Sequence, residues 1–381
     1  MPFKRIALGL LLAFTLLESP RIHPLHAQSA APPARAADLN HKVYLPLIAK
    51  PPAWQRLNSN LPLRWIRDIA INPTPPHEIL AALHDQGTEP DPLVGLYRSV
   101  DGGQSWTQVN NLDARHVAFA PSNPAIAYAT VFNNVLLSVD RGQTWTRILP
   151  NTIPGGGWAL AIDPTNADHV YIGLNTNATY HVYETLNRGQ SWAPKALSLV
   201  QNEGIVSLAI DPSNPQTLFA GANTDVAADR QTPYTRLFKS TNGGASWALV
   251  QNGFPNSKRV TSIRFNPCNP NQVLVSRQKH GNVDQYLRRS PDKGLTWATI
   301  ALSDDDIGIS PLSPCPIFSD MFSSRDGGLT WQSIAFNFNE IVSDPTAVVY
   351  SVWAPDPWNN VLWLGTRDHG MFFMQGIVSN P

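Results

Sequence analysis

The stretch Ser99-Val100-Asp101-Gly102-Gly103-Gln104-Ser105-Trp106 recurs along the chain and sets the spacing of everything between its copies. Five further copies follow the pattern Ser/Thr-x-Asp/Asn-x-Gly-x-Ser/Thr-Trp, at residues 138–145, 185–192, 240–247, 290–297 and 324–331. A short acid or amide folds onto nearby backbone N–H groups and glycine accepts a positive φ, so the pattern predicts a tight turn between two strands. The Trp that ends each copy begins an outgoing strand, and we expect its indole to be buried against a neighbouring repeat.

A second constant segment lies upstream of each tryptophan turn. Apolar strands that end in a proline turn stand at residues 69–73, 117–121, 160–164, 208–212 and 263–267. An extended segment follows each of them, and after a variable loop a further strand leads into the tryptophan turn. Each repeat therefore predicts four antiparallel strands, A to D, with the proline turn between A and B and the tryptophan turn between C and D.

The tryptophan turn resembles the Asp-box, or bacterial neuraminidase repeat, of β-propellers. The residues that carry the resemblance are Asp101, Trp106, Asp140, Trp145, Asn187, Trp192, Asn242, Trp247, Asp292, Trp297, Asp326 and Trp331. Such propellers include sialidases, sortilins, xyloglucanases and Ycf48-like assembly factors of photosystem II, and the chain is closest in plan to the single-domain Ycf48-like and sialidase-like propellers. The resemblance implies that these residues are structural, since the family's Asp-box is a turn at the blade periphery.

Counting the repeats predicts seven blades. Five repeats are complete, a sixth is degraded, and a seventh begins at residues 348–355 and lacks both a tryptophan turn and a D strand. The segment at residues 53–58 reads like the D strand at 105–110, so we expect it to complete the seventh blade. The predicted fold is all-β, a seven-bladed propeller over residues 53–378, closed by an N-terminal strand that removes both free sheet edges.

The N-terminus has the features of an export signal. Residues 1–27 contain a short basic start, an apolar run at 6–17 and the ending Leu25-His26-Ala27, and they predict a cleaved signal peptide. The apolar run is too short to span a bilayer as a helix. Residues 28–52 predict a Pro/Ala-rich linker, so we expect a secreted or extracytoplasmic protein.

Composition limits the kinds of partner. The 34 Pro, 24 Gly and 12 Trp fit many short strands joined by turns, and 28 basic against 28 acidic residues leave no electrostatic footprint for nucleic acid or an anionic membrane. His77 and His84 lack the i, i+4 spacing of a helical metal site. We expect no metal, no cofactor, no nucleic-acid partner, no membrane insertion after signal cleavage, and a monomer.

Cys268 and Cys315 are the only cysteines, and both lie beside proline turns of adjacent repeats. Such turns share one rim of a propeller, but a disulfide needs Cα atoms within about 7 Å, which the sequence does not give. Export to an oxidising compartment would favour the bond. The sequence therefore leaves the pairing open and disfavours a catalytic thiol or a zinc site.

The D–A and B–C loops should share the face opposite the tryptophan turns, where closure of the ring directs them to the central channel. Ten residues of these loops are candidate binding groups: Arg64, Trp65, Arg67, Asp113, Arg115, His116, Trp158, Glu203, Lys258 and Arg259. A mixed-charge mouth that carries tryptophan suits a protein, a peptide or a glycan.

Two function classes stay open. The first is a non-enzymatic binding or assembly protein, which needs only a shaped surface. The second is a glycosidase, which needs two carboxylic acids about 5–10 Å apart, or in a sialidase an arginine triad with an acid and a Tyr nucleophile. Candidate groups exist for the second class, at Asp68, Asp113, Glu203, Asp304, Asp305, Asp306 and Tyr350, but the Arg-Ile-Pro motif of sialidases is absent from the propeller repeats. We favour binding over hydrolysis.

Overall fold

The structure is a computed structural model of the chain, and it describes residues 54–57, 59–84, 91–153, 155–175, 181–197, 199, 203–224, 236–250, 260–277, 287–301, 306–319, 322–334, 350–356, 358–366 and 369–376. All of them lie in one compact unit, residues 51–381. The predicted signal peptide and the predicted linker up to residue 52 lie outside the described residues.

The described strands form seven four-stranded antiparallel blades. Blade 1 holds β2 (Trp65–Ile71), β3 (Ile79–His84), β4 (Gly95–Ser99) and β5 (Thr107–Asn110). Blade 2 holds β6 (Ala114–Phe119), β7 (Ala127–Val131), β8 (Asn134–Ser138) and β9 (Thr146–Arg147). Blade 3 holds β10 (Gly156–Ile162), β11 (Val170–Asn175), β12 (Val182–Thr185) and β13 (Ala193–Lys195). Blade 4 holds β14 (Glu203–Ile210), β15 (Leu218–Thr224), β16 (Leu237–Ser240) and β17 (Ala248–Leu249).

The remaining blades follow the same order. Blade 5 holds β18 (Val260–Asn266), β19 (Asn269–Arg277), β20 (Leu287–Ser290) and β21 (Ala298–Ala301). Blade 6 holds β22 (Ile307–Ile309), β23 (Ile317–Ser319), β24 (Phe322–Ser324) and β25 (Gln332–Ser333). Blade 7 holds β26 (Tyr350–Asp356), β27 (Val361–Thr366) and β28 (Met371–Gln375), with β1 (Gln55–Arg56) as its outer strand.

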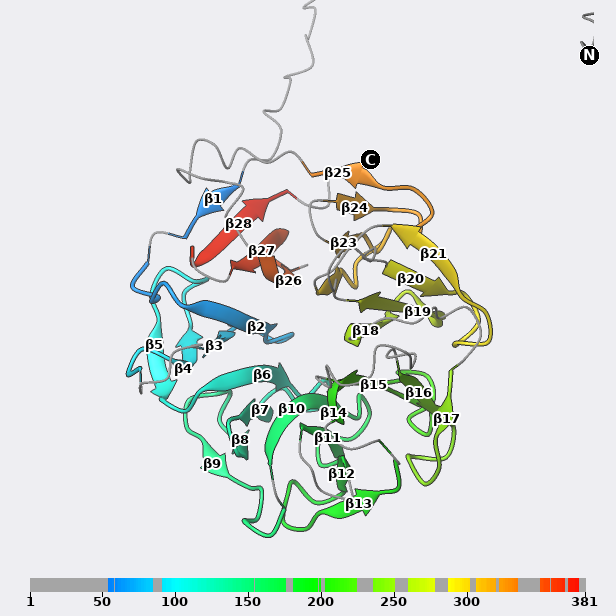
Figure 1. The fold of residues 1–381 in the computed structure, drawn as a ribbon. Helices are drawn as coiled ribbons and strands as arrows, with labels where there is room; N and C mark the ends of the chain where they lie inside the picture. The colour runs from blue at the N-terminus through cyan, green and yellow to red at the C-terminus, as the bar shows by residue number, and fades with distance from the viewer. Residues whose placement is uncertain are drawn as a thin grey trace, which may run out of the picture. The chain divides into compact units, whose positions relative to one another are not determined.

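The N-terminal strand closes the ring, as the sequence predicts. Gln55 pairs with Phe373 and Arg56 with Phe372, so β1 supplies the D strand that blade 7 lacks. The A strands form a closed cycle of contacts, from β2 through β6, β10, β14, β18, β22 and β26 back to β2, and they surround the centre in Figure 1. The seven-bladed propeller is therefore confirmed, with closure between the first and last strands of the chain.

The A strand of blade 7 ends on a buried acid. Strand β26 continues to Asp356, which pairs with Val361. Asp356 thus occupies the position of Asn72 and Asp163, the buried polar residues that end the A strands of blades 1 and 3. The Ala354-Pro355 pair of this repeat therefore lies two residues before the position that the Asn-Pro and Asp-Pro pairs occupy in the other repeats.

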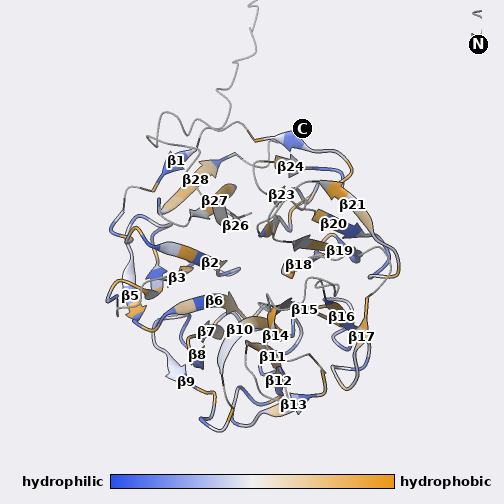
Figure 2. Ribbon diagram, in the orientation of Figure 1, coloured by the Kyte–Doolittle hydropathy of each residue, from blue (hydrophilic) through white to orange (hydrophobic). Residues whose placement is uncertain are grey.

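The core lies between blades. Leu80 and Leu96 of blade 1 pack against Val117 and Ala129 of blade 2. Other pairs of neighbouring blades share hydrophobic clusters in the same way. Figure 2 shows apolar residues along the strands and hydrophilic residues in many of the outer turns. A lone blade would expose both faces, so each blade depends on its neighbours to remove apolar surface from water, at about 25 cal/mol per Å².

The tryptophan turns have the hydrogen bonds that their sequence requires. In the first, Ser99 Oγ accepts from Gly103 N at 2.8 Å, Asp101 Oδ1 accepts from Ser105 N at 2.9 Å, and Trp106 Nε1 donates to Gly103 O at 2.9 Å. Asn187 and Asn242 accept the same backbone bond in their turns, at 2.9 Å each, which fits a turn-forming role. Hydrogen bonds from side chains and backbone also lower the pKa of Asp292 to about 2, although burial by itself would raise it.

The expected burial of the indoles holds for only one of the six turns. Trp106 is 4% exposed, whereas the side chains of Trp145, Trp192, Trp247, Trp297 and Trp331 are half-buried. The tryptophan turns lie at the outer edge of each blade, where one face of the indole remains near solvent. Trp54, which begins the closing strand, is also buried, at 1% exposed.

Candidate functional site

A β-bulge recurs at one position of the A strand. It lies five residues before the buried residue that precedes the proline turn, and six described A strands contain it. The residues omitted from the pairing are Arg67, Arg115, Trp158, Val206, Thr261 and Ser351. A bulge re-aims a side chain and often lies beside functional sites. In blades 1 to 3 it places two arginines and a tryptophan at the mouth formed by the D–A and B–C loops.

The first aromatic cluster lies between blades 1 and 2. The Arg67 guanidinium lies 4.3 Å from the centre of the Trp65 ring, and the Trp65 and His84 rings are 5.3 Å apart. His84 Nδ1 lies 2.5 Å from Asp113 Oδ1. These residues come from the start of β2, the end of β3 and the loop before β6, because antiparallel strands bring those three chain segments to the same face.

The second aromatic cluster lies between blades 2 and 3. The Arg115 guanidinium lies 3.9 Å from the centre of the Trp158 ring. Arg115 is 8% exposed, whereas Trp158 is half-buried, so the indole covers the cation. Such cation–π contacts contribute about 0.5–2 kcal/mol and fix the orientation of the indole. Arg115 therefore positions Trp158, whose half-buried ring borders the mouth.

Arg64 borders the first cluster. Its guanidinium forms an ion pair with Asp91, and its side chain is 36% exposed. The hydrogen bond from the Arg64 guanidinium, together with one from the Leu93 backbone N–H, lowers the pKa of Asp91. The pair links the D–A side of blade 1 to its B–C loop.

A ring of polar groups lies one residue further into the channel. Asp68 accepts from Val117 N at 3.1 Å and lies 3.3 Å from His116 Nδ1. Across the ring, Asp306 accepts from Ser262 Oγ at 2.6 Å and from Arg264 Nη2 at 3.1 Å. The charge of Asp306 raises the pKa of Arg264 further.

The channel itself is a cavity of about 690 Å³. Its wall is mainly apolar, and one position along the A strands carries Ala or Gly in every blade except the fifth: Ala70, Ala118, Ala161, Ala209, Arg264, Gly308 and Ala354. Small side chains leave the centre open. Arg264, with a side chain 47% exposed, extends into that space toward Asp306.

The structure brings together seven of the ten predicted binding residues: Arg64, Trp65, Arg67, Asp113, Arg115, His116 and Trp158. Glu203 begins β14, but its side chain is not among those described, and Lys258 and Arg259 lie outside the described residues. Sequence reasoning missed His84 and Arg264. A charged residue where the other repeats have Ala or Gly was the signal that could have found Arg264.

Membrane-spanning helices and metal clusters are both absent from the described ranges. Within them, no helix is long and apolar enough to cross a membrane. No three His, Cys, Asp or Glu side chains of this part of the chain are grouped so that they could hold a metal ion.

Comparisons with known proteins agree with this architecture. The family described as sortilin, neurotensin receptor 3, matches residues 133–282, and no curated protein sequence matches the chain. Among solved structures, a GH74 enzyme from Niastella koreensis superposes with a TM-score of 0.64 at 18% identity, over 84% of this chain and 54% of the enzyme. Ycf48 from Cyanidioschyzon merolae superposes with a TM-score of 0.56 at 15% identity, over 85% of this chain and 99% of Ycf48.

The chain shares the propeller fold of Ycf48. A structure of Ycf48 bound to D1 peptide gives a TM-score of 0.55 at 15% identity, over 86% of this chain and 96% of that one. The propeller spans about half the length of the GH74 enzyme. At these identities the likeness concerns the fold alone.

Proposed function

We propose that this propeller is an exported, non-enzymatic binding protein that recognises an acidic segment of a protein or peptide on its D–A and B–C loop face. The observation that carries the proposal is the pair of arginine–indole stacks on the bulges of successive blades, Arg67 on Trp65 and Arg115 on Trp158. Tryptophan and arginine are the residues that most often dominate binding energy at protein interfaces.

The charge of the two clusters favours an acidic ligand. Arg67 and Arg115 stack on indoles, and three described acids beside these clusters, Asp68, Asp91 and Asp113, each lie against a histidine or an arginine. The acids are thus engaged within the protein, and the half-buried Arg67 and Trp158 border solvent. A carboxylate beside an aromatic or apolar residue would complement this surface.

Binding of labelled acidic peptides to the full chain tests the proposal. We expect Glu/Asp-rich peptides to bind, and Trp158→Ala and Arg67→Ala each to weaken binding about tenfold or more, with affinity falling as salt rises. Phe132→Ala is the matched control, because Phe132 is 59% exposed in the B–C loop of blade 2 and belongs to neither arginine–indole stack. Equal binding of basic peptides, or unchanged affinity in both cluster variants, would refute the proposal.

The disulfide supports export. Cys268 and Cys315 are joined in the structure, with Cα atoms 6.3 Å apart, and such bonds persist in oxidising compartments.

A glycoside hydrolase is the second candidate function. The GH74 superposition favours it, together with the carboxylates Asp68 and Asp113 at the channel mouth. Screening aryl-glycosides and glycans with the full chain beside Asp68→Asn and Asp113→Asn tests it. Turnover that is lost in a variant would replace the binding proposal by this one.

A further inference from the structure

The opposite mouth of the channel, where the proline turns lie, has a rim with a different chemistry. Six described prolines line the cavity there: Pro73, Pro121, Pro164, Pro212, Pro267 and Pro311. The residue after each proline completes the rim, in the order Thr74, Ser122, Thr165, Ser213, Cys268 and Leu312, and Trp358 stands at the matching position of blade 7. Among these rim positions Trp358 alone is aromatic, and none bears a charge.

Trp358 is held in place from both sides of a blade interface. Its backbone N–H donates to Asp356 Oδ1 at 3.1 Å, and its ring stacks on His77 of blade 1, with centroids 5.3 Å apart and planes 18° apart. His77 is in turn fixed by Nδ1, which lies 3.1 Å from Asn72 O. The indole lines the cavity and is 47% exposed. An exposed tryptophan with a defined orientation at a cavity mouth is a ready platform for a ligand.

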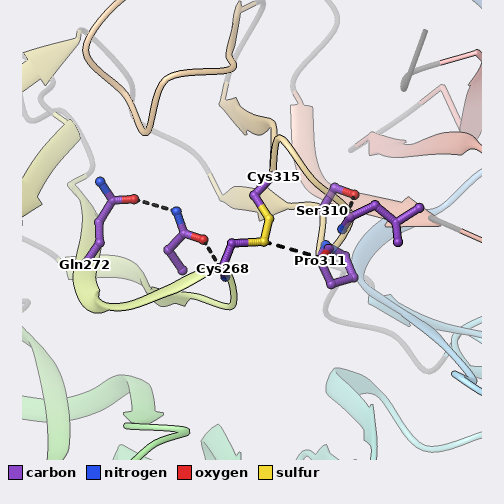
Figure 3. The surroundings of a disulfide bond; sticks show 7 residues. Cys268, Gln272, Ser310, Pro311 and Cys315 are labelled. Atoms are coloured by element: carbon purple, nitrogen blue, oxygen red, sulfur yellow. Dashed lines mark hydrogen bonds between the residues drawn. A yellow bond between two sulfur atoms is a disulfide. The ribbon is translucent and has the colours of Figure 1, made fainter. Parts of the chain in front are cut away.

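The two positions that Trp358 and His77 occupy at the interface of blades 7 and 1 hold a disulfide at the interface of blades 5 and 6. Cys268 occupies the position of Trp358, because each lies two residues after the buried residue that ends its A strand. Cys315 occupies the position of His77 in the following blade, because each lies five residues after that residue. Figure 3 shows the two cysteines bonded between these turns, beside Pro311. One interface is therefore covalently closed, and the other is held by a ring stack that leaves an indole face available.

Two threonine hydroxyls of this mouth have their protons engaged within the protein. Thr74 Oγ1 and Thr165 Oγ1 donate their protons to Asn72 and Asp163, at 2.8 and 2.7 Å, which leaves oxygen lone pairs on the hydroxyls. Because a carbonyl can only accept, His77 Nδ1 donates to Asn72 O. A ligand that supplies O–H donors would complement the hydroxyl oxygens of the rim.

Charge near the rim is compensated. Lys293 reaches Ser213 Oγ at 2.7 Å, and the same ammonium group lies 2.6 Å from Asp211 Oδ2. A charged ligand would find no uncompensated partner among the described rim residues.

From these observations we infer that the proline-turn mouth is a binding site for a neutral oligosaccharide, with a pyranose ring stacked on Trp358. A pyranose has an apolar C–H face for the indole and several hydroxyl donors for the acceptors of the rim. A proline-rich peptide would also stack on the indole, but it lacks the donors. The cavity of about 690 Å³ is within the usual size range of ligand pockets.

Calorimetric titration of the full chain with cellotetraose, mannotetraose and maltotetraose tests the inference. We expect at least one of these neutral probes to bind, Trp358→Ala to weaken that binding at least tenfold, and Trp358→Phe to retain it within about threefold. Thr74→Val, which removes a hydroxyl but keeps the backbone bond to Asn72 Oδ1 at 2.9 Å, should weaken it severalfold without unfolding the protein.

Two controls locate the site. Leu186→Ala changes a residue of the peripheral tryptophan turn of blade 3, which is 63% exposed, and Trp158→Ala changes the opposite face of the channel; both variants should bind the probe like the wild type. Failure of all three tetrasaccharides to bind, unchanged affinity in Trp358→Ala, or preferential binding of a hexaproline peptide would overturn the inference. Loss of binding in Trp158→Ala alone would move the glycan to the loop face and would also overturn it.

Discussion

At the scale of single residues, Trp106 differs from the other tryptophans of its turns because blade 7 covers it. It packs in one cluster with Leu61 and Trp363, and Asn60 brackets its backbone with hydrogen bonds of 2.8 Å to both N and O. Trp145, which has the same turn and the same bond from its indole Nε1 to a glycine carbonyl, lacks this cover and is half-buried. Burial of one indole thus depends on the interface where the ring closes.

Truncating the two indoles should therefore have unequal costs. We expect Trp106→Ala to lower the free energy of unfolding by about 3–5 kcal/mol, the range for a buried aromatic residue, and Trp145→Ala to lower it by about half as much or less. Urea denaturation of both variants measures this difference. Equal losses would show that the exposed face of Trp145 contributes as much as a buried one, contrary to the area argument.

At the scale of one element, blade 3 contains a buried ionic network that the sequence did not reveal. His169 Nδ1 lies 2.9 Å from Asp163 Oδ2, and His169 Nε2 lies 2.9 Å from Glu184 Oε1. Lys195 Nζ lies 2.5 Å from the other oxygen of Glu184. Burial disfavours the charged imidazole, but the hydrogen bonds to Glu184 and Asp163 raise its pKa above the ordinary 6.5.

Glu184 shows the complementary shift. Burial by itself would raise its pKa, but hydrogen bonds from His169 and Lys195 lower it from 4.5 to about 2. The stabilisation from charged Glu184 is present above about pH 4.5 and is lost as the pH falls toward 2. The stabilisation from charged His169 is complete below about pH 6.5 and is lost as the pH rises through its folded-state pKa.

Thermal unfolding between pH 6 and 9 tests this network. The Tm of the wild type should fall as the pH rises above 6.5, and the fall should be smaller in His169→Gln, which cannot lose a proton. His77→Gln is the control, because His77 Nδ1 bonds to a backbone carbonyl, and this variant should keep the dependence of the wild type. The network would have no such role if His169→Gln and the wild type showed the same fall.

At the scale of the whole molecule, stability depends on ring closure. Strand β1 joins the last blade through Gln55 and Arg56, and the A strands contact one another around the complete circle. The disulfide adds a covalent link between blades 5 and 6, across 47 residues of sequence. Blades that cannot separate keep their shared faces away from water.

Removing the disulfide should destabilise the ring. For a loop of this length the chain-entropy account gives about 4 kcal/mol, and we expect the variant Cys268→Ser/Cys315→Ser to lose roughly 2–4 kcal/mol. Chemical denaturation with and without a reductant measures it. The reductant should destabilise the wild type and leave the double variant unchanged, and an equal effect on both would show that the stabilisation does not come from this bond.

The sequence by itself determined the architecture, because its signals are local. Each tryptophan turn closes through hydrogen bonds within five residues, such as Asp101 to Ser105, and the spacing of the turns counts the blades. It also placed seven candidate residues on one face, since antiparallel strands alternate in direction. Its error, the burial of the outer indoles, concerns their neighbours in space, which the repeat pattern does not contain.

Only the tertiary structure decided which residues meet. The stacks of Arg115 on Trp158 and of Trp358 on His77 join different blades. The second stack joins residues that are 281 positions apart in the sequence. The Cys268–Cys315 bond likewise joins two blades, whereas the His169 network depends on how the strands and the turn of blade 3 pack together. The physical reason is that turn chemistry acts over a few residues, whereas contacts between blades are fixed by packing around the whole circle.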